Sequence, residues 1–341
     1  MARKTGLILL NLGTPASPHP KDVGVYLREF LMDPLVVDIP YALRWMLVNL
    51  LIVPRRSVAS GKLYEKIWTP EGSPLLIYTL SLARKVAAEM PDWEVAPAMR
   101  YGQPSITAAL SQMRDSGVDS LVVFPLYPQF SLAATESSER EVRRLAAKIL
   151  PGVKLVFVEA FYDDHRYLDA VKTVSEPLLD RSWFTLFSFH GLPERQVKKT
   201  DLTGRHCLAV SSCCDRMSAA NACCYRAQSY ATARGLAQRL QLEPGRWDVA
   251  FQSRLGTTPW IRPYSDAFYE ALPAQGVKHL NVLTPSFTAD CLETLEEVQM
   301  RGEEAFRKAG GETLRLIPSL NDHPAWIRAV RAIAEGYQPK T

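Results

Sequence analysis

The sequence predicts an α/β protein made of two consecutive units, each a parallel sheet covered by helices on both faces. Three observations lead to this fold class. Short apolar runs alternate with stretches of helical periodicity, the loops between them are short, and the pattern occurs twice along the 341 residues. A chain of this length is too long for one typical domain and can bury two sizeable cores.

The first unit carries four apolar runs of strand length, bounded by Gly, Pro or polar residues. The predicted strands are 6–12, 95–102, 120–126 and 153–158. Helical periodicity marks the stretches around them, at 21–31, 62–67, 75–90, 105–116 and 137–150. Such alternation is typical of parallel strands joined by crossover helices.

The second unit repeats this pattern. Its predicted strands are 183–189, 247–252, 279–283 and 313–317, and its predicted helices are 166–179, 225–240, 266–272, 290–308 and 324–336. We expect the boundary near 161–165. The N-terminal half would then span 1–163 and be completed by the C-terminal helix 324–336, and the C-terminal half would span 164–323.

Charge and hydropathy give no indication of a nucleic-acid-binding, secreted or membrane-spanning protein. The formal net charge is +4 and the basic residues are scattered, which gives no indication of a nucleic-acid-binding surface. The sequence contains no uncharged apolar run of about 18 residues. Its N-terminus also lacks the apolar core and cleavage site of a signal peptide. We therefore expect a cytoplasmic protein without a transmembrane helix.

The most apolar segment is 41–53, which is too short to span a bilayer and is followed by Pro54, Arg55 and Arg56. One interpretation is a helix of the core. The other is an apolar lip at the mouth of a pocket, resting on a membrane with its aromatic side chains at the interface and the arginines near headgroups. The sequence leaves both open.

One apolar run of the second unit ends on a histidine. Residues 185–189 read as a buried strand, and Gly191 and Pro193 stop the strand directly after His190. In open α/β sheets the ligand crevice lies outside the carboxyl ends of the strands. An imidazole there can bind a metal or accept a proton near neutral pH. A lone histidine is more often only the end of a strand, so the functional interpretation needs a partner.

That partner follows the strand 279–283. On a helix, the i, i+3, i+7 spacing of Asp290, Glu293 and Glu297 places the three carboxylates on one face. The structural interpretation is a capping box, with Asp290 as N-cap and Glu293 three residues on. The functional interpretation is a strip of carboxylates that shares a crevice with His190 and passes on a divalent cation or takes protons from a substrate nitrogen.

Cysteine usage is uneven. Cys291 stands alone, whereas five cysteines share one short window: Cys207, Cys213, Cys214, Cys223 and Cys224. In a reducing compartment such clustering indicates a metal or an iron–sulfur cluster more often than disulfides.

Five motifs together resemble the ferrochelatase family, the enzymes that insert iron into a porphyrin. The motifs are 11–15 (NLGTP), 124–131 (FPLYPQFS), 188–193 (SFHGLP), 251–254 (FQSR) with Pro259-Trp260, and 287–295 (FTADCLETL). Each motif alone is weak. They occur in the family's order, however, and the resemblance extends from near residue 6 to about residue 323.

The resemblance implies two similar Rossmann-like, chelatase-like domains, each a four-stranded parallel sheet flanked by helices, with the porphyrin in the cleft. It implies a lyase whose catalytic and metal-handling pair is His190 and Glu293, with Asp290 and Glu297 continuing the acidic strip. Whether His190 or Glu293 takes the pyrrole protons stays open. The implied substrate contacts are Arg100, Tyr101, Tyr127, Ser131 and Trp260 around the macrocycle, and Arg55, Tyr64 and Ser73 near its propionates.

The chain departs from the family at 199–224, an insertion that holds all the clustered cysteines. Four thiolates can hold a [2Fe–2S] cluster or a structural zinc. Some ferrochelatases carry a [2Fe–2S] cluster, so the resemblance favours the cluster. We expect its ligands to be Cys207, Cys213, Cys214 and Cys224, with Cys223 as a substitute. Because the insertion has few apolar residues, the metal would organise it.

The leading functional hypothesis is insertion of ferrous iron into protoporphyrin IX, the last step of haem synthesis. Coproporphyrin III is the alternative substrate, although the apolar segment 41–53 favours the less polar porphyrin. A haem-binding or redox-sensing protein on the same fold is the alternative from another class. Peripheral contact of 41–53 with the inner face of the cytoplasmic membrane, and a homodimer, are compatible with the resemblance.

Overall fold

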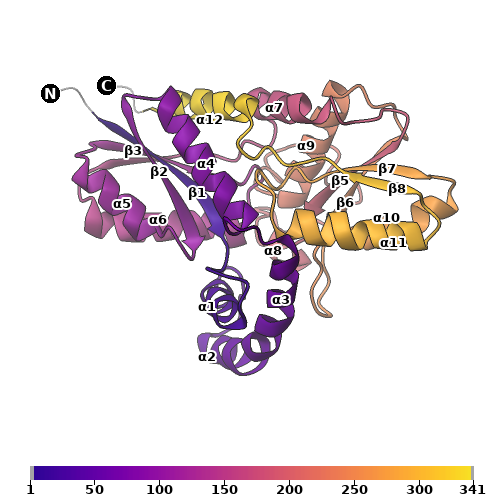
Figure 1. Cartoon of the computed structure of the whole chain (residues 1–341), viewed down its shortest axis with the longest axis horizontal. Helices are drawn as coiled ribbons and strands as arrows, with labels where there is room; N and C mark the ends of the chain where they lie inside the picture. Colours follow the sequence, from indigo (N-terminus) through magenta and orange to yellow (C-terminus); the bar gives the residue numbers. More distant parts are fainter. Residues whose placement is uncertain (1–3, 339–341) are drawn as a thin grey trace. The chain divides into compact units, whose positions relative to one another are not determined.

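The computed structural model describes residues 4–338, which fold into two compact units. Unit 1 contains the chain up to Tyr127, Leu132–Glu159 and the chain from Ile327 onward. Unit 2 contains Pro128–Ser131 and Ala160–Trp326. Each unit is built around its own parallel sheet, and the colours of Figure 1 separate the N-terminal sheet in indigo and magenta from the C-terminal one in pink and orange.

The sheet of unit 1 has the order β2-β1-β3-β4, with every pair parallel. Its strands are β1 (Thr5–Gly13), β2 (Trp93–Tyr101), β3 (Ser120–Pro125) and β4 (Lys154–Phe157). Residues Leu7 to Leu10 of β1 are all fully buried, because a central parallel strand is covered on both faces and therefore needs a continuous apolar run. The alternation seen in the sequence thus produces the predicted sheet.

The helices of unit 1 are α1 (Pro20–Leu31), α2 (Tyr41–Met46), α3 (Val53–Ile67), α4 (Pro74–Glu89), α5 (Ile106–Asp115), α6 (Ser137–Ile149) and α12 (Pro324–Gly336), with the π-helical segments η1 (Leu47–Ile52) and η2 (Leu132–Glu136). One core lies between the sheet and α5 and α6, where Leu110, Met113 and Val142 pack against Ile8 and Leu121. These positions follow the helical periodicity of the sequence.

The sheet of unit 2 has the order β6-β5-β7-β8 and is likewise parallel throughout. Its strands are β5 (Phe184–His190), β6 (Trp247–Gln252), β7 (His279–Leu283) and β8 (Thr313–Leu316). In both units the first strand is central, the second lies on one side of it, and the third and fourth lie on the other. The repeat in the sequence is therefore a repeat of topology, as predicted.

The helices of unit 2 are α7 (His165–Ser175), α8 (Glu194–Lys198), α9 (Tyr225–Arg239), α10 (Ser265–Ala274) and α11 (Glu303–Lys308), with the π-helical segment η3 (Glu293–Gly302) leading into α11. A core forms between the sheet and α10, η3 and α11, where Tyr269, Val298 and Phe306 pack against Leu186 and Val282. The fully buried Val298 fixes which face of η3 meets the sheet.

Two helix predictions need correction. The helix expected at 290–308 begins at Glu293 and is π-helical over its first ten residues, so its hydrogen bonds span five residues instead of four. The helix expected at 62–67 is only the end of α3, which begins at Val53. Pro54 lies in its first turn, where a missing N–H leaves no helical hydrogen bond unmade.

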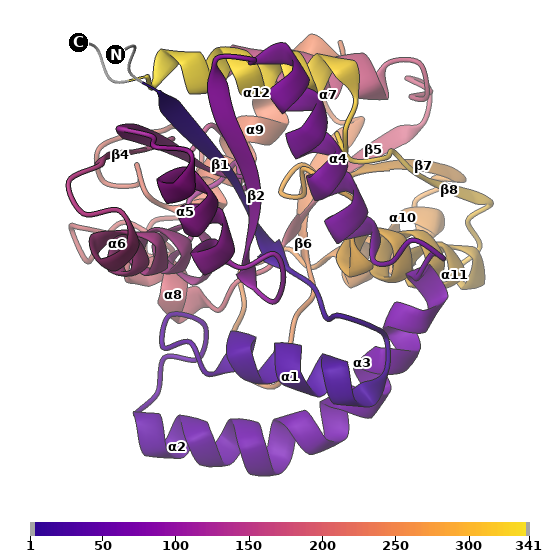
Figure 2. The same cartoon turned by 60° about the vertical axis from the view of Figure 1, so that its left-hand side comes forward.

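The apolar segment 41–53 is not a core helix. Of the fourteen large apolar side chains exposed in the described part of the chain, seven lie between residues 41 and 58: Tyr41, Leu43, Trp45, Met46, Leu50, Leu51 and Val58. In Figure 2, α1 runs alongside α2 and α3 beyond the carboxyl ends of β1 and β2. We call the exposed apolar surface of residues 41–58 the apolar lip. Within residues 4–338, no helix has the length and apolar character needed to cross a membrane.

The apolar lip is anchored by its polar residues. Arg44 is buried, and its Nη1 donates hydrogen bonds to the carbonyl oxygens of Val37 and Ile39 at 3.1 and 3.0 Å. Gly24 of α1 faces Val53 and Ser57 of α3, where a Cβ atom would already be in van der Waals contact. These contacts hold the segment in place while its apolar side chains point to solvent.

Candidate functional site

The central histidine lies where the sequence places it, at the carboxyl end of β5 beside Gln252 of β6. His190 Nδ1 is 2.5 Å from the carbonyl oxygen of Gly191. A carbonyl can only accept a hydrogen bond, so Nδ1 carries the proton and the lone pair of the neutral ring is on Nε2. His190 is therefore oriented as a base or as a metal ligand through Nε2.

Aromatic side chains flank this imidazole. The ring centroids of Trp260 and Phe287 lie 6.4 and 6.2 Å from that of His190. Gly191 allows the close packing, because a Cβ atom there would come within 2.6 Å of the carbonyl oxygen of Gln252. Trp260 is only 8% exposed, and its Nε1 has no hydrogen-bond partner among the described residues.

The end of β6 holds the start of η3. The buried Gln252 accepts a hydrogen bond from Ser188 Oγ at 2.7 Å and donates one from Nε2 to the main-chain carbonyl of Glu293 at 2.8 Å. Its amide thereby fixes the backbone that carries the predicted acidic partner of His190. The Glu293 side chain itself is half-buried.

Glu297 lies within electrostatic reach of both residues of this pair. Burial raises its pKa, and repulsion from Glu293 raises it further, whereas hydrogen bonding to Ser253 and the charges of His190 and Arg301 lower it. The net pKa of Glu297 is above the usual value for glutamate. Glu297 therefore interacts with His190 and with Glu293 within unit 2.

Asp290 does not share the face of the other two acids. It is buried ahead of η3, where its carboxylate accepts hydrogen bonds from Thr294 Oγ1 at 3.0 Å, the Ser319 N–H at 3.3 Å and Asn321 Nδ2 at 2.8 Å. The predicted face of three carboxylates assumed an α-helix starting at Asp290. Because the helix starts three residues later, Asp290 joins the loop contacts instead.

No cage for a single metal ion is preformed in the described chain. Within residues 4–338, no group of three or more His, Cys, Asp or Glu side chains is arranged to hold one.

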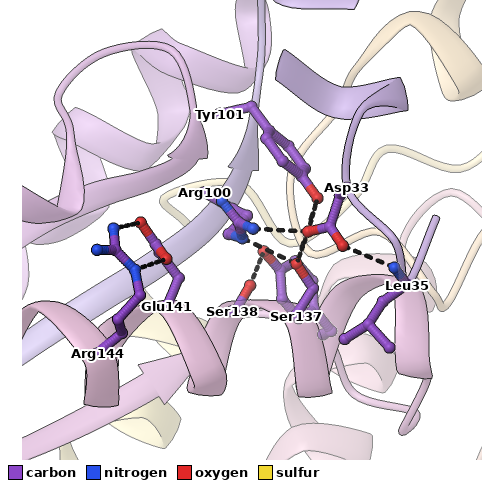
Figure 3. A network of polar contacts seen from close by, with 9 residues as sticks. Asp33, Leu35, Arg100, Tyr101, Ser137, Ser138, Glu141 and Arg144 are labelled. Carbon is purple, nitrogen blue, oxygen red and sulfur yellow. Dashed lines mark hydrogen bonds and ion pairs between the residues drawn. The ribbon is translucent and has the colours of Figure 1, made fainter. Parts of the chain in front are cut away.

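The corresponding edge of unit 1 is different, as Figure 3 shows. Asp33 Oδ2 accepts hydrogen bonds from Arg100 Nη2 at 2.6 Å, Tyr101 Oη at 2.9 Å and Ser137 Oγ at 2.5 Å, and its Oδ1 accepts from the Leu35 N–H at 2.7 Å. Burial raises the pKa of Asp33, but these hydrogen bonds and the charge of Arg100 outweigh it and leave the pKa below its usual value.

Other residues expected to contact substrate are placed as follows. Tyr127 is half-buried with its hydroxyl 3.3 Å from Ser138 Oγ, and the buried Ser73 accepts a hydrogen bond from Thr14 Oγ1 at 2.9 Å. Tyr64 is buried in unit 1 and Ser131 is buried in unit 2. Arg55 lies exposed on the first turns of α3, next to the apolar lip, and donates to the Leu51 carbonyl at 3.2 Å.

The cysteine-rich insertion brings four thiols together. Cys207, Cys213, Cys214 and Cys224 are each at most 4% exposed, whereas Cys223 is exposed. The sulfurs of Cys213 and Cys214 are 3.7 Å apart, and Cys224 interacts with both Cys207 and Cys214. The pKa of Cys214 is raised by its hydrogen bond with Cys224 and by burial. Arg226 Nη1 lies 3.0 Å from Cys214 Sγ.

Sequence reasoning missed three polar residues that organise these regions. The sequence assigned no role to Asp33, Gln252 or Ser253, although the last two lie in the 251–254 motif. Gln252 could have been found, because it is a polar residue in an apolar strand. The contacts of Asp33 and the positive φ of Ser253 (65°) could not be predicted from neighbouring residues.

Comparisons with known proteins agree with these arrangements. A sequence model of the ferrochelatase family matches residues 4–337. Ferrochelatase of Pseudomonas fluorescens (strain SBW25) is 44% identical over 331 residues, covering 96% of this chain and 97% of the relative. Ferrochelatase of Azotobacter vinelandii is 46% identical over 326 residues, covering 95% and 96%. That of Coxiella burnetii (strain Dugway 5J108-111) is 43% identical over 335 residues, covering 97% and 93%.

Among solved structures, SirB from Bacillus subtilis with Fe3+ superposes with a TM-score of 0.54 at 13% identity, covering 98% of each chain. This likeness supports the chelatase fold alone. The sequence comparisons go further, since they cover nearly the full length of the chain at 43–46% identity. The chain belongs to the ferrochelatase family, the enzymes that insert iron into a porphyrin.

Proposed function

We propose that the protein inserts ferrous iron into protoporphyrin IX, with His190 taking the pyrrole protons and Glu293 and Glu297 delivering the metal. The observation that carries the assignment is the hydrogen bond from His190 Nδ1 to the Gly191 carbonyl, which leaves Nε2 as the basic atom. The Glu297 carboxylate on η3 interacts electrostatically with this imidazole and with Glu293.

The reaction needs both kinds of group. Metallation releases two protons from the pyrrole nitrogens, so a base must stand beside the centre of the ring. Ferrous iron must also lose water to ligands that still release it, and nitrogen and oxygen donors in an incomplete set meet that requirement. His190 serves the first need, and the Glu293–Glu297 pair serves the second.

The sequence predicted that Asp290 would extend the acidic strip. Its hydrogen bonds support a structural role instead. Its carboxylate accepts from three groups at once. In our proposal Asp290 holds the start of η3 in place, and Glu297 extends the metal path beyond Glu293.

The proposed substrate contacts are those that the family resemblance implies. We assign Trp260, Arg100, Tyr101, Tyr127 and Ser131 to the macrocycle. The unpartnered Nε1 of Trp260 beside His190 supports its role, since a buried donor without a partner is costly unless a ligand or water accepts from it. The propionates are assigned to Arg55, Tyr64 and Ser73, of which Arg55 is exposed next to the apolar lip.

Protoporphyrin IX is favoured over coproporphyrin III by the apolar lip. Its exposed Trp45, Leu50 and Leu51 suit a porphyrin with few charged substituents and an apolar membrane surface from which that porphyrin is delivered. Coproporphyrin III carries four propionates and would want more basic groups there. We therefore place the lip at the inner face of the cytoplasmic membrane.

Anaerobic iron insertion tests the proposal. Purified protein, ferrous iron and either porphyrin are mixed, and the loss of porphyrin fluorescence is followed. We expect turnover of protoporphyrin IX to exceed that of coproporphyrin III. A haem carrier on the same fold would bind haem without converting either porphyrin. Faster turnover of coproporphyrin III would reverse the substrate assignment, and full activity in His190→Ala would overturn the site.

We further propose that the insertion 199–224 holds a [2Fe–2S] cluster through Cys207, Cys213, Cys214 and Cys224. Support comes from their common burial and from the Arg226 guanidinium beside Cys214, which stabilises a thiolate. A binuclear cluster spreads its thiolates over two irons, so the four sulfurs need not converge on one point. When bound, such a cluster supplies one-electron chemistry and ties the insertion together.

The visible spectrum of the purified protein tests the cluster. Cys214→Ser should remove the colour and lower the thermal midpoint. The matched control is Cys223→Ser, which changes an exposed neighbouring thiol and should leave both unchanged. A colourless protein with bound zinc would establish the alternative metal. An unchanged spectrum and melting curve in Cys214→Ser would contradict both assignments.

A further inference from the structure

We propose that Ser253 is a positioning residue for iron delivery: it holds the Glu297 carboxylate in the orientation that receives ferrous iron and keeps its ion pair with Arg301 long. The inference rests on the proposed role of Glu297 and adds a residue to which no role was assigned. Three features of the structure carry it, namely the backbone of Ser253, its two hydrogen bonds and the neighbouring guanidinium.

The backbone of Ser253 is in an unfavourable conformation. Directly after β6, it has φ of 65°, in the left-handed region that residues with a Cβ atom rarely adopt. Glycine would occupy this conformation at lower cost. Strained non-glycine residues concentrate at functional sites, where the side chain supplies something that glycine lacks.

Ser253 supplies two donors to one carboxylate. Its N–H donates to Glu297 Oε1 at 2.7 Å and its Oγ donates to Glu297 Oε2 at 2.6 Å. Two points of attachment fix the plane of the carboxylate, whose side chain is only 15% exposed. Each oxygen of a carboxylate can accept more than one hydrogen bond, so lone pairs remain for a cation.

Arg301 is the competitor for this carboxylate. It lies one turn further along the same helical segment, with Nη2 3.9 Å from Glu297 Oε2, and it already pairs with the buried Glu296 at 2.7 Å. Without the Ser253 hydroxyl, the carboxylate can rotate towards the guanidinium and shorten this 3.9 Å ion pair into a direct hydrogen bond. A Glu297 engaged in that way would be a poorer ligand for iron.

The preceding residue acts on the other acid of the pair. Gln252 holds the main chain of Glu293, and Ser253 holds the side chain of Glu297. The end of β6 thus holds Glu293 by its main chain and Glu297 by its carboxylate, and His190 lies at the end of the adjacent β5.

The decisive variant is Ser253→Gly, because it separates structural from functional effects. Glycine keeps the N–H, removes the hydroxyl and relieves the left-handed strain. We expect a KM for ferrous iron raised about tenfold or more and a KM for porphyrin within about twofold, with a thermal midpoint near that of wild type because the lost hydrogen bond offsets the relieved strain. A residue with a purely structural role would leave both KM values unchanged.

Two further variants serve as controls. Gln241→Gly relieves the same backbone strain at an exposed position after α9, where φ is 56°, and should raise the midpoint without changing either KM. Ser253→Ala loses the hydroxyl but keeps the strain. Ser253→Ala should show the same change in KM for iron as Ser253→Gly, with a lower thermal midpoint. If one of these two variants folds poorly, the other still tests the inference.

A double-mutant cycle separates the inference from the proposed function. Calorimetric binding of Co2+ to the porphyrin-free protein is measured for wild type, Ser253→Gly, Glu297→Gln and the double variant. We expect Ser253→Gly to weaken binding in wild type but not in the Glu297→Gln background. Normal Co2+ affinity and normal KM for iron in Ser253→Gly would overturn the inference. A wild type that binds Co2+ through this pair yet inserts no iron would overturn only the proposed function.

Discussion

At the carboxyl edge of the first sheet, the polar side chains form hydrogen bonds and an ion pair with one another. Asp33 accepts from Arg100, Tyr101 and Ser137 and from a main-chain N–H, so its carboxylate is fully engaged within unit 1. At the same edge of the second sheet, His190 and Glu293 follow a sheet of identical strand order and remain half-buried.

The difference between these two edges shows how one topology supports two tasks. Both sheets place polar residues where parallel strands end, and that placement follows from the fold. Unit 1 uses them to fix the loop that leads into the apolar lip, since Asp33 binds the N–H of Leu35 and its carbonyl accepts from Val36 and Val37. In the proposed mechanism, unit 2 supplies the basic and acidic atoms from its own side chains, because a shared fold does not by itself imply a shared reaction.

The largest effect should come from His190. His190→Ala should lower iron insertion by about 100-fold or more, because it removes the proposed base for the pyrrole protons. Anaerobic assays of porphyrin fluorescence measure it. The counterpart on the other edge is Asp33→Asn, whose folded fraction should keep its turnover within about tenfold of wild type. An equal loss in both variants would mean that the two edges do not divide the tasks as described.

A large loss of stability should come instead from the first edge. Asp33→Ala leaves the Arg100 guanidinium, 17% exposed, without its carboxylate, and should lower the free energy of unfolding by about 3 kcal/mol. Urea titration measures the change. Glu141→Ala removes the exposed pair with Arg144 near the same network and should alter the midpoint little. Comparable effects of the two variants would contradict the importance of burial.

The contribution of Asp33 should also depend on pH. Its pKa in the folded protein lies below the usual 3.8, so the unfolded chain is protonated first as the pH falls. The stability is therefore complete above the unfolded pKa and is lost as the pH falls through the folded value. The difference in unfolding free energy between wild type and Asp33→Asn should stay constant between about pH 7 and pH 5 and shrink below about pH 4. A difference that grows with acidification would contradict the assigned charge state.

The smallest change in stability is expected at the apolar lip. Leu50→Gln replaces an exposed side chain and should alter the free energy of unfolding by less than about 0.5 kcal/mol. Co-sedimentation with anionic lipid vesicles should fall several-fold, since the variant loses apolar contact area. Destabilisation without any change in vesicle binding would show that the segment packs against protein.

Much of the fold could be predicted from the sequence, because burial constrains the pattern of apolar residues in strands and helices. Strands such as 7–10 are buried on both faces and therefore must be continuously apolar, and helices must show one apolar stripe. The positions of His190 and Glu293 after strands came from the same patterns, and their pairing came from the family resemblance. Sequence periodicity thus located the strand ends at which these residues lie.

Other features could not be predicted, because they depend on contacts between distant residues. The i, i+3, i+7 rule assumed α-helical geometry, whereas packing makes the segment after Leu292 π-helical and leaves Asp290 outside it. The side-chain partners of Asp33 lie 67 to 104 residues away. The positive φ of Ser253 has no local signature, since serine is common in ordinary loops.

The π-helical form of η3 has a consequence for the tolerance of this region to insertions and deletions. A π-helical turn accommodates one residue more than an α-helical turn, so deleting a single residue within Glu293–Gly302 would let the segment relax to regular α-helix. The shorter segment and its tighter winding would nearly cancel, so the residues after it would keep their faces. A deletion in the following regular helix α11 (Glu303–Lys308) has no such slack and would rotate the residues after it by about 100°.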